Sequence, residues 1–310
     1  MQRIGGKKMN FVEWLQRRQR EINSMVCLGL DTDRSLIPKC VYASNPVLEF
    51  NQSIVKKTSS FVCAYKINTA FYFSDEGEPI YPLGEYNLRK TIDFSHERYP
   101  EIPVILDAKF GDVVHASEKY ARVAFERFKA DAVTVSPYLG KDALQPFLDY
   151  KDKGVIILCL TSNADAEGFQ NLLVYSDRFN KELGVWVREE PVPFYFKVAE
   201  RVANHWNKNG NCLLVVGATY PKGLKEVRRI VGDMPILVPA IGKQGGDLEA
   251  VIKNGLDSTG YGLIISASRS IIYASKNKDF AEIAAREAKK LRDDINRIKE
   301  GNNDNRKKTD

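Results

Sequence analysis

The sequence predicts an α/β fold in a single domain, a (β/α)8 or TIM barrel with an extra helix at its N-terminus. Two observations predict it. Eight short apolar runs alternate with longer amphipathic stretches along almost the whole chain. The runs are nearly continuous in Val, Ile, Leu and Cys, which is typical of parallel strands buried on both faces. Eight such strands with helices between them fit one closed barrel.

The expected strands cover residues 26–30, 61–67, 104–108, 132–136, 155–160, 212–217, 236–241 and 261–267. A doubly wound open sheet is the alternative fold. That fold commonly carries a GxGxxG fingerprint after its first strand, and no such motif follows residues 26–30. The closed barrel is therefore favoured.

The expected helices cover residues 10–23, 47–57, 115–130, 192–206, 223–232, 247–255 and 280–300, where apolar residues recur on one helical face. The longest irregular connection, 162–192, follows the fifth strand and predicts a lid or binding loop. We expect a basic N-terminal segment over 1–10, the barrel domain over 11–299, and a disordered polar tail over 300–310.

The net charge of +6 is distributed unevenly along the 310 residues. Residues 1–20 carry +5, residues 296–310 carry +2, and the remainder carries −1. Solvated, partly disordered ends explain this pattern, and contact with a polyanion is the alternative. Because the body of the chain is near neutral, we expect no nucleic-acid partner.

The cysteine and apolar patterns exclude several classes of protein. None of the five cysteines sits in a CxxC pair, so we expect no zinc site or disulfide framework, and four lie in strand-like runs that suit buried thiols. No apolar run approaches the roughly 18 residues that span a membrane. The basic N-terminus lacks the apolar stretch of a secretory signal. We expect a cytoplasmic protein without a membrane partner.

Charged residues at the ends of the second and third strands form the strongest candidate site. Active sites of such barrels lie at the C-terminal ends of the strands. Asp107 and Lys109 are two residues apart and share one face of an extended backbone, and Asp112 follows where a helix begins. Lys66 completes an alternating array, in which a lysine between carboxylates keeps its proton. A structural salt-bridge cluster is the alternative.

IGKQGGD and SASRS, after the seventh and eighth strands, predict a phosphate site. Successive glycines let backbone N–H groups approach an anion, and a helix begins at Asp247. Arg269 could clamp the phosphate through paired hydrogen bonds. A plain turn would explain the glycines alone, but phosphate sites recur after these two strands.

Seven motifs resemble, in order and spacing, those of the orotidine 5′-phosphate decarboxylases, in their longer bacterial and protozoan-like branch. The similarity runs from about Phe11 to Ser275. DxKxxD alone is shared with relatives such as the ketogulonate-phosphate decarboxylases, whereas the full set is specific. The motifs are LGLDTD, YKINTAFY, LDAKFGD, VTVSPYLG, LTSNADA, PAIGKQGGD and SASRSIIYAS.

The resemblance implies a cofactor-free and metal-free enzyme that converts orotidine monophosphate to uridine monophosphate. It implies that Lys109 donates a proton to C6 of the pyrimidine, and that Asp107 and Lys66 complete the charged array and hold the ribose. It also implies a homodimer in which Asp112 joins the array of the neighbouring subunit.

The same resemblance implies the substrate contacts. Asp31 and Asn68 would contact the sugar and its surroundings, Thr161 and Ser162 the pyrimidine edge, and Gln244 and Arg269 the phosphate.

The segment after DxKxxD departs from the family pattern. Val114 stands where glycine is common, and Ala116 stands where threonine is common. Ser117 lies one position further on and is the only nearby hydroxyl of this segment. The departure puts one ribose contact in question but leaves the charged array intact.

Two other functions compete with the decarboxylase. One is a metal-dependent decarboxylase or aldolase acting on a sugar phosphate, against which the Thr161–Ser162 pair and the Gln244 loop argue. The other is a non-enzymatic barrel that binds nucleotides or nucleic acid, against which the complete Lys–Asp array argues. Sensitivity to a chelator would separate the two enzymes.

Overall fold

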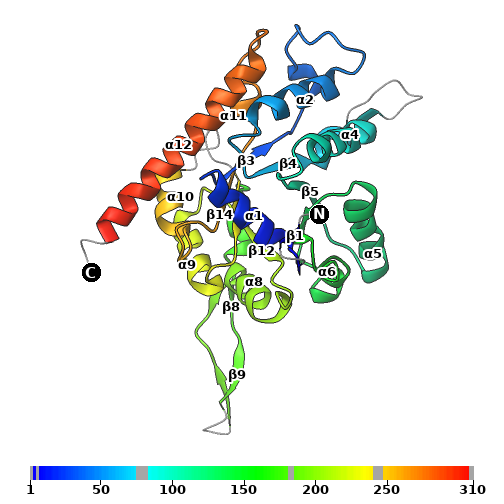
Figure 1. Ribbon diagram of the computed structural model, residues 1–310. Coiled ribbons are helices and arrows are strands. Elements are labelled where there is room, and N and C mark those ends of the chain that lie inside the picture. Colours follow the sequence, from blue (N-terminus) through cyan, green and yellow to red (C-terminus); the bar gives the residue numbers. More distant parts are fainter. Residues whose placement is uncertain (1–2, 5–6, 75–82, 181–184, 240–246, 307–310) are drawn as a thin grey trace.

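The computed structural model describes residues 3–4, 7–74, 83–180, 185–239 and 247–306, and its centre is a closed barrel of parallel strands (Figure 1). The strands follow one another in chain order, and pairing of the last with the first closes the ring. All eight expected strands are confirmed, and closure rules out the open sheet. They are β3 (Val26–Gly29), β4 (Ala64–Asn68), β5 (Val104–Phe110), β6 (Ala132–Val135), β7 (Gly154–Leu160), β12 (Cys212–Val216), β13 (Ile236–Val238) and β14 (Leu263–Ala267).

Helices surround the barrel, and each expected helix is present. π-helical turns continue α5 over Val123–Arg127 and α8 over Val202–Trp206, and a 3₁₀ turn covers Arg34–Leu36. The helices are α1 (Phe11–Glu21), α2 (Pro46–Thr58), α3 (Thr69–Phe73), α4 (Leu83–Arg98), α5 (Val114–Arg122), α6 (Lys141–Leu148), α7 (Glu167–Gln170), α8 (Phe194–Arg201), α9 (Pro221–Val231), α10 (Leu248–Gly255), α11 (Arg269–Ile272) and α12 (Phe280–Arg306).

The sequence pattern did not predict α4 and α6. The buried face of α4 includes Asn87, Thr91 and Ser95, so it lacks a continuous apolar stripe. These polar side chains are buried with hydrogen-bond partners, for example Asn51 Nδ2 to Thr91 Oγ1 at 3.0 Å. α6 is short and contains Pro146, a residue that normally interrupts a helix. Tertiary hydrogen bonding therefore stabilises α4, and burial of apolar residues such as Leu144 and Phe147 stabilises α6.

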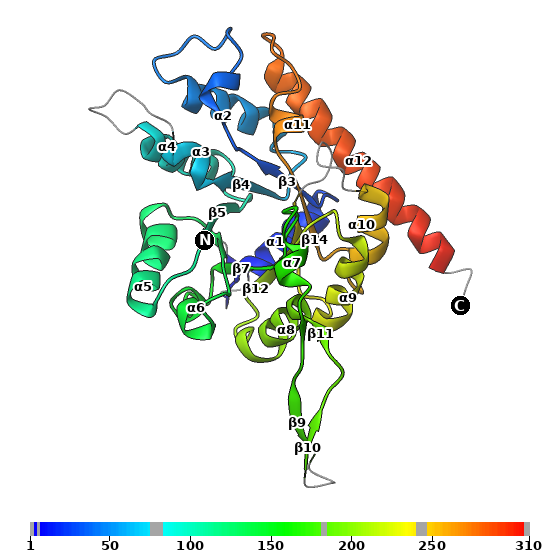
Figure 2. The ribbon, with the colours of Figure 1, turned by 180° about the vertical axis from the view of Figure 1, so that it is seen from behind.

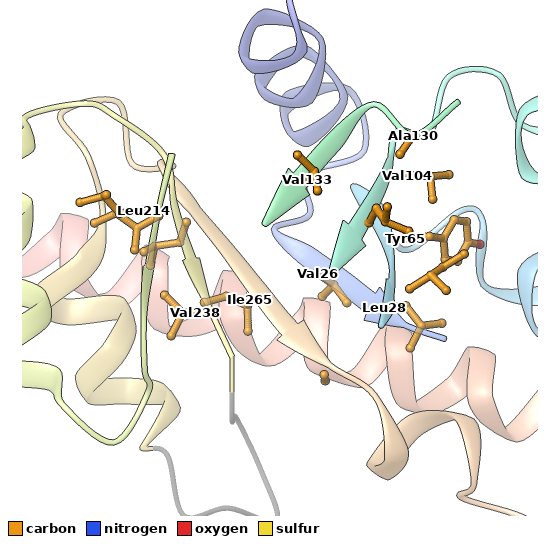
Figure 3. Packing of buried hydrophobic residues seen from close by; sticks show 14 of the residues in the cluster. Val26, Leu28, Tyr65, Val104, Ala130, Val133, Leu214, Val238 and Ile265 are labelled. Atoms are coloured by element: carbon orange, nitrogen blue, oxygen red, sulfur yellow. The ribbon is translucent and has the colours of Figure 1, made fainter. Parts of the chain in front are cut away.

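Alternation along each strand divides the core into two layers. Val26 and Leu28 of β3 pack outward against the helices, whereas Cys27 between them faces the barrel interior. Figure 3 shows part of the outer layer, where Leu28, Tyr65 and Val104 lie together beside β3, β4 and β5. The strand residues of the inner layer are Cys27, Ala64, Ile105, Ala132, Ile156, Leu213, Val215, Leu237 and Ile264.

Helix α1 closes the N-terminal end of the barrel. Its Phe11 and Leu15 are fully buried and belong to the inner layer. Gly154, the first residue of β7, leaves room for Phe11, because a Cβ at this position would collide with the ring. Asn10 and Glu13 form a capping box that fixes the start of the helix. The extra N-terminal helix is confirmed, and its place leaves the opposite end of the barrel free.

The long connection after β7 is more regular than the sequence predicts. Beyond α7, β8 (Leu173–Val174) pairs with β11 (Val192–Pro193), and β9 (Asp177–Asn180) pairs with β10 (Val185–Arg188). Both pairs are antiparallel, and the ribbon that they form projects far from the barrel (Figures 1 and 2). Its role as a lid stays a prediction.

The two ends of the chain differ from each other. At the N-terminus, Arg3–Ile4 (β1) and Lys7–Lys8 (β2) form a short antiparallel pair in the predicted basic segment. At the C-terminus, the prediction of disorder from residue 300 is corrected, because α12 continues to Arg306 along the outside of the molecule (Figure 2). The stretch contains no proline, and a single glycine at 301 costs only about 1 kcal/mol in a helix. Residues 307–310 lie outside the described residues.

Among the described helices, none combines the length and the apolar character needed to cross a bilayer.

Candidate active site

Three interior side chains at the C-terminal ends of neighbouring strands build the site. Lys66, Asp107 and Thr134 each lie two residues beyond an inner-layer residue of β4, β5 and β6, so alternation points them into the barrel mouth. All three are buried. Lys66 Nζ lies 2.7 Å from Asp107 Oδ2, and Thr134 Oγ1 donates to Asp107 Oδ1 at 2.9 Å. The predicted pairing of Lys66 with Asp107 is confirmed.

The side chain of Lys109 reaches the same carboxylate from an irregular stretch of the β5 backbone. Its Nζ lies 2.6 Å from Asp107 Oδ1, so the predicted meeting of the two side chains is confirmed. The backbone is not regular there, because Lys109 has φ +51° and the register of β5 against β6 shifts between Leu106 and Phe110. A β-bulge, and not plain alternation, therefore aims Lys109. Its side chain is 49% exposed and reaches the solvent side of the array.

Lys66 and Asp107 hold each other ionised. Burial alone would lower the pKa of Lys66, but the charges of Asp31 and Asp107 outweigh it and raise that pKa well above its ordinary value. Burial alone would raise the pKa of Asp107, yet Lys66 and Lys109 bring it well below the usual range. Lys66 and Asp107 therefore stay charged at neutral pH, and the ammonium group of Lys109 lies on the exposed side of this pair.

Asp31 and Asn68 lie beside this array. Asp31 Oδ1 is 3.7 Å from Lys66 Nζ, and among the described residues this buried oxygen has no hydrogen-bond partner. Asn68 caps α3, because its Oδ1 accepts the N–H of Ala70 at 3.1 Å. Ser268, which sequence reasoning did not single out, packs against Gly29 and also has a buried hydroxyl without a partner in the described chain. Such oxygens are available for hydrogen bonds to a bound molecule.

Asp112 stands apart from the array. Its Oδ1 accepts the N–H of Val113 at 2.7 Å just before α5, and within the described chain no ion pair joins it to Lys66 or Lys109. The single chain therefore does not bring the fourth predicted charge into the cluster. Ser117 is buried, and its hydroxyl donates to the carbonyl of Asp112 at 2.9 Å. It is thus engaged in holding the start of α5.

The remaining predicted residues that the structure describes lie at the ends of β7 and β14. The N–H of Thr161 donates to Gln170 Oε1 at 2.8 Å, and Gln170 Nε2 donates to Thr161 Oγ1 at 3.1 Å, so α7 fixes this strand end. Ser162 packs closely against Gly217, at the end of β12. Arg269 begins α11 and is exposed.

The predicted phosphate loop is described only in part. Gln244 lies outside the described residues, as does most of IGKQGGD. Asp247 is described and is the N-cap of α10, because its Oδ1 accepts the N–H of Ala250 at 3.1 Å. The predicted helix start is confirmed, and the phosphate contact stays a prediction.

No ligand set for a metal ion is found in the described part of the chain. Within it, no three acidic, histidine or cysteine side chains come close enough to hold an ion together. The expectation of metal-free chemistry stays a prediction that a chelator tests.

Comparison with known proteins places this geometry in a family. Residues 24–283 match the model of the orotidine 5′-phosphate decarboxylase / HUMPS family. The chain belongs to this family. A curated relative from Cellvibrio japonicus, named orotidine 5′-phosphate decarboxylase, is 45% identical over 93% of this chain and 98% of its own length. A relative of the same name from Ralstonia pickettii is 42% identical over 94% of this chain and all of its own length.

A solved structure of a family member shares the architecture. Leishmania donovani OMP decarboxylase superposes with a TM-score of 0.74 at 34% identity, covering 94% of this chain and 99% of that chain. The sequence resemblance to the family is therefore confirmed. Among the described residues of this mouth, Thr134 and Ser268 are two polar residues that sequence reasoning missed. Thr134 could have been found from the sequence, because it lies two residues after Ala132 and alternation places both on the interior face of β6.

Proposed function

We propose that this protein decarboxylates orotidine 5′-phosphate to uridine 5′-phosphate, a step of pyrimidine nucleotide biosynthesis, without a metal or cofactor. The observation that carries the proposal is the Lys66–Asp107–Lys109 array at the mouth of the barrel. Relatives that are 42–45% identical over almost their whole length carry this activity in their names. A salt-bridge cluster with a purely structural role would not need a half-exposed lysine.

Lys109 is the proposed proton donor. When the bond between C6 and the carboxylate carbon breaks, CO2 leaves and the electron pair stays on C6. Preorganised positive charge beside that carbon stabilises the transition state. The Nζ of Lys109 is held by Asp107 on one side, and it is open to the mouth on the other. It transfers its proton to C6 and later regains a proton from water.

Asp107 and Lys66 keep that lysine in place and, in the proposal, hold the ribose. Asp107 uses one oxygen for each lysine, so a single buried carboxylate holds both ammonium groups in fixed positions. Asp31 and Asn68 stand beside them, where the sugar would lie. Thr161 and Ser162 would meet the pyrimidine edge, and Gln244 and Arg269 the phosphate. Binding of the distant phosphate then contributes energy that is expressed in the transition state.

A homodimer would complete each site with Asp112 of the neighbouring subunit. Asp112 lies outside the charged cluster of its own chain, although it follows the array by only three residues. Large apolar side chains are exposed on the loops after β5 and β6, with Val113 at 62% and Tyr138 at 72%. Exposed apolar residues gathered around a site are typical of a protein interface. Both observations support a shared site at the mouth.

We also propose that the protein works in the cytoplasm. Its cysteines are free, and Cys27, Cys63, Cys159 and Cys212 are buried. Buried unpaired thiols suit a reducing compartment.

An absorbance assay with orotidine monophosphate, in the presence and absence of EDTA, tests the proposal. We expect conversion to uridine monophosphate at the same rate in both, because the proposed chemistry needs no metal ion. Loss of activity with EDTA that added Mg²⁺ restores would refute the metal-free chemistry. No conversion under either condition by correctly folded protein would refute the decarboxylase.

A further inference from the structure

The hydroxyl of Thr134 lies between the backbone and the side chain of the catalytic array. Thr134 is only 1% exposed and faces the barrel interior from β6. Its Oγ1 accepts the backbone N–H of Lys109 at 2.9 Å and donates to Asp107 Oδ1 at 2.9 Å. The same Oδ1 accepts from Lys109 Nζ at 2.6 Å. Lys109, Thr134 and Asp107 thus form a closed ring of hydrogen bonds.

This ring leaves the hydroxyl only one orientation. A threonine hydroxyl has a single proton to donate. Since the oxygen already accepts the N–H of Lys109, the proton points at Asp107. A serine could form the same two bonds, whereas a valine of similar shape could form neither.

The backbone of Lys109 needs such a partner. A residue with a Cβ is strained at φ +51°, and the shifted register of β5 against β6 takes this N–H out of the regular ladder. Without Thr134 the N–H would be left unpaired next to a buried carboxylate, which is costly in a protein interior. The hydroxyl therefore stabilises the bulge that aims the Lys109 side chain at the mouth.

We infer that Thr134 is a positioning residue, which holds the bulge at Lys109 and the carboxylate of Asp107 in the geometry needed for proton delivery. The inference rests on the proposed function, in which Lys109 protonates the substrate carbon. Thr134 does not touch the substrate. Its loss should therefore slow the chemical step and leave substrate binding nearly unchanged.

Thr134→Val tests the inference in the full-length protein. We expect kcat to fall by about 10- to 100-fold with KM within about threefold, because a misplaced proton donor weakens interactions made only in the transition state. Thr134→Ser should recover most of kcat, since it keeps the hydroxyl. Thr58→Val is the matched control, because Thr58 is also fully buried but bonds to Ile54 and Tyr65 outside the site. Its kcat should equal that of the wild type.

Each possible outcome decides the inference. Wild-type kcat in Thr134→Val, or a rise in KM alone, overturns it. A loss of kcat that Thr134→Ser does not restore also overturns it, because the effect would then come from packing. If Thr134→Val does not fold, Thr134→Ala must show the same loss of kcat, and Thr134→Ser must show the same recovery.

Lys109→Ala, assayed under the same conditions, separates the role of Thr134 from that of Lys109. Substantial activity in Lys109→Ala refutes the proposed role of Lys109 as proton donor, and the inference with it, whereas an inactive Lys109→Ala with full kcat in Thr134→Val refutes the inference alone. Failure of the wild-type protein to convert orotidine monophosphate would refute the proposed function itself.

Discussion

At the scale of single residues, the site depends on how one carboxylate serves two lysines. Asp107 is buried, and its oxygens separately bind Lys66 and Lys109. Lys66 is enclosed, with 7% of its side chain exposed, while 49% of the Lys109 side chain is exposed. The two lysines therefore have different roles. Lys66 stabilises the buried carboxylate, and Lys109 presents a charge and a transferable proton to the mouth.

Lys109→Ala should abolish turnover and leave the fold intact, because it removes both the charge and the proton at the reacting carbon. We expect kcat to fall by roughly three orders of magnitude or more. Steady-state kinetics and a thermal melt measure the two parts of this prediction. Lys57→Ala is the control, because Lys57 is 51% exposed and forms an ion pair with Glu282 elsewhere on the surface. Retention of more than a few per cent of activity by Lys109→Ala would contradict its role.

Arg269→Ala should mainly weaken binding of the phosphorylated substrate. Loss of a charge-assisted contact costs about 2 kcal/mol, or about 30-fold in affinity. The variant should also discriminate less between orotidine monophosphate and unphosphorylated orotidine. Comparison of kcat/KM for the two substrates measures this, with Arg229→Ala, an exposed arginine paired with Glu226, as the control. An unchanged preference would show that Arg269 does not bind the phosphate.

At the scale of elements, the two ends of the barrel have separate tasks. α1 fills the N-terminal end, where Phe11 fits over Gly154, and the strand ends opposite carry the polar residues. Because of this division, α1 contributes stability to the barrel without contacting the candidate active site. The close approach of Phe11 to the start of β7 also explains why a glycine stands in an otherwise apolar strand.

Gly154→Ala and Phe11→Ala should show strong coupling in a double-mutant cycle. Overpacking by the new Cβ should cost about 1–3 kcal/mol, and the cavity left by the phenyl ring about 3–5 kcal/mol. The double variant should lose clearly less than the sum, because removal of the ring makes room for the methyl group. Urea unfolding midpoints measure all three. Gly301→Ala, with open space around it on α12, should not destabilise. If the two losses of stability were simply additive, the close packing of Phe11 against Gly154 would be contradicted.

At the scale of the whole molecule, the proposed site needs residues of two chains. The barrel of a single chain assembles Lys66, Asp107 and Lys109, whereas the carboxylate of Asp112 accepts the N–H of Val113 and, among the described residues, does not join them. A symmetric dimer formed across the mouths would let each chain supply Asp112 to its partner. The exposed apolar side chains near the mouth would then be buried.

Mixing two inactive variants tests the shared site. Lys109→Ala and Asp112→Asn homodimers should each be nearly inactive. After subunit exchange, about half of the dimers are mixed, and in each of these one site carries both defects and the other carries neither. Activity should therefore recover to about a quarter of the wild-type value. If both residues served the same chain, every site of the mixed dimer would keep one defect, so no recovery after proven exchange would refute the shared site.

The sequence by itself determined the barrel, its eight strands, the N-terminal helix and the residues of the charged array. These features follow from local patterns, namely continuous apolar runs, amphipathic spacing and polar residues placed directly after strands. A resemblance carried by seven motifs then identified the family. The helices α4 and α6 were not predictable in this way, since buried polar side chains and an internal proline hide their pattern.

Only the tertiary structure decided how the array is held. Strand β6 comes beside β5 through pairing in the barrel, so the contact of Thr134 with Lys109 and Asp107 spans more than 20 residues of sequence. The left-handed backbone at Lys109 coincides with that contact and with the shifted register. Local sequence favours a regular strand there. Local sequence patterns therefore determine which residue types stand at the strand ends. The closure of the barrel determines which way their side chains point.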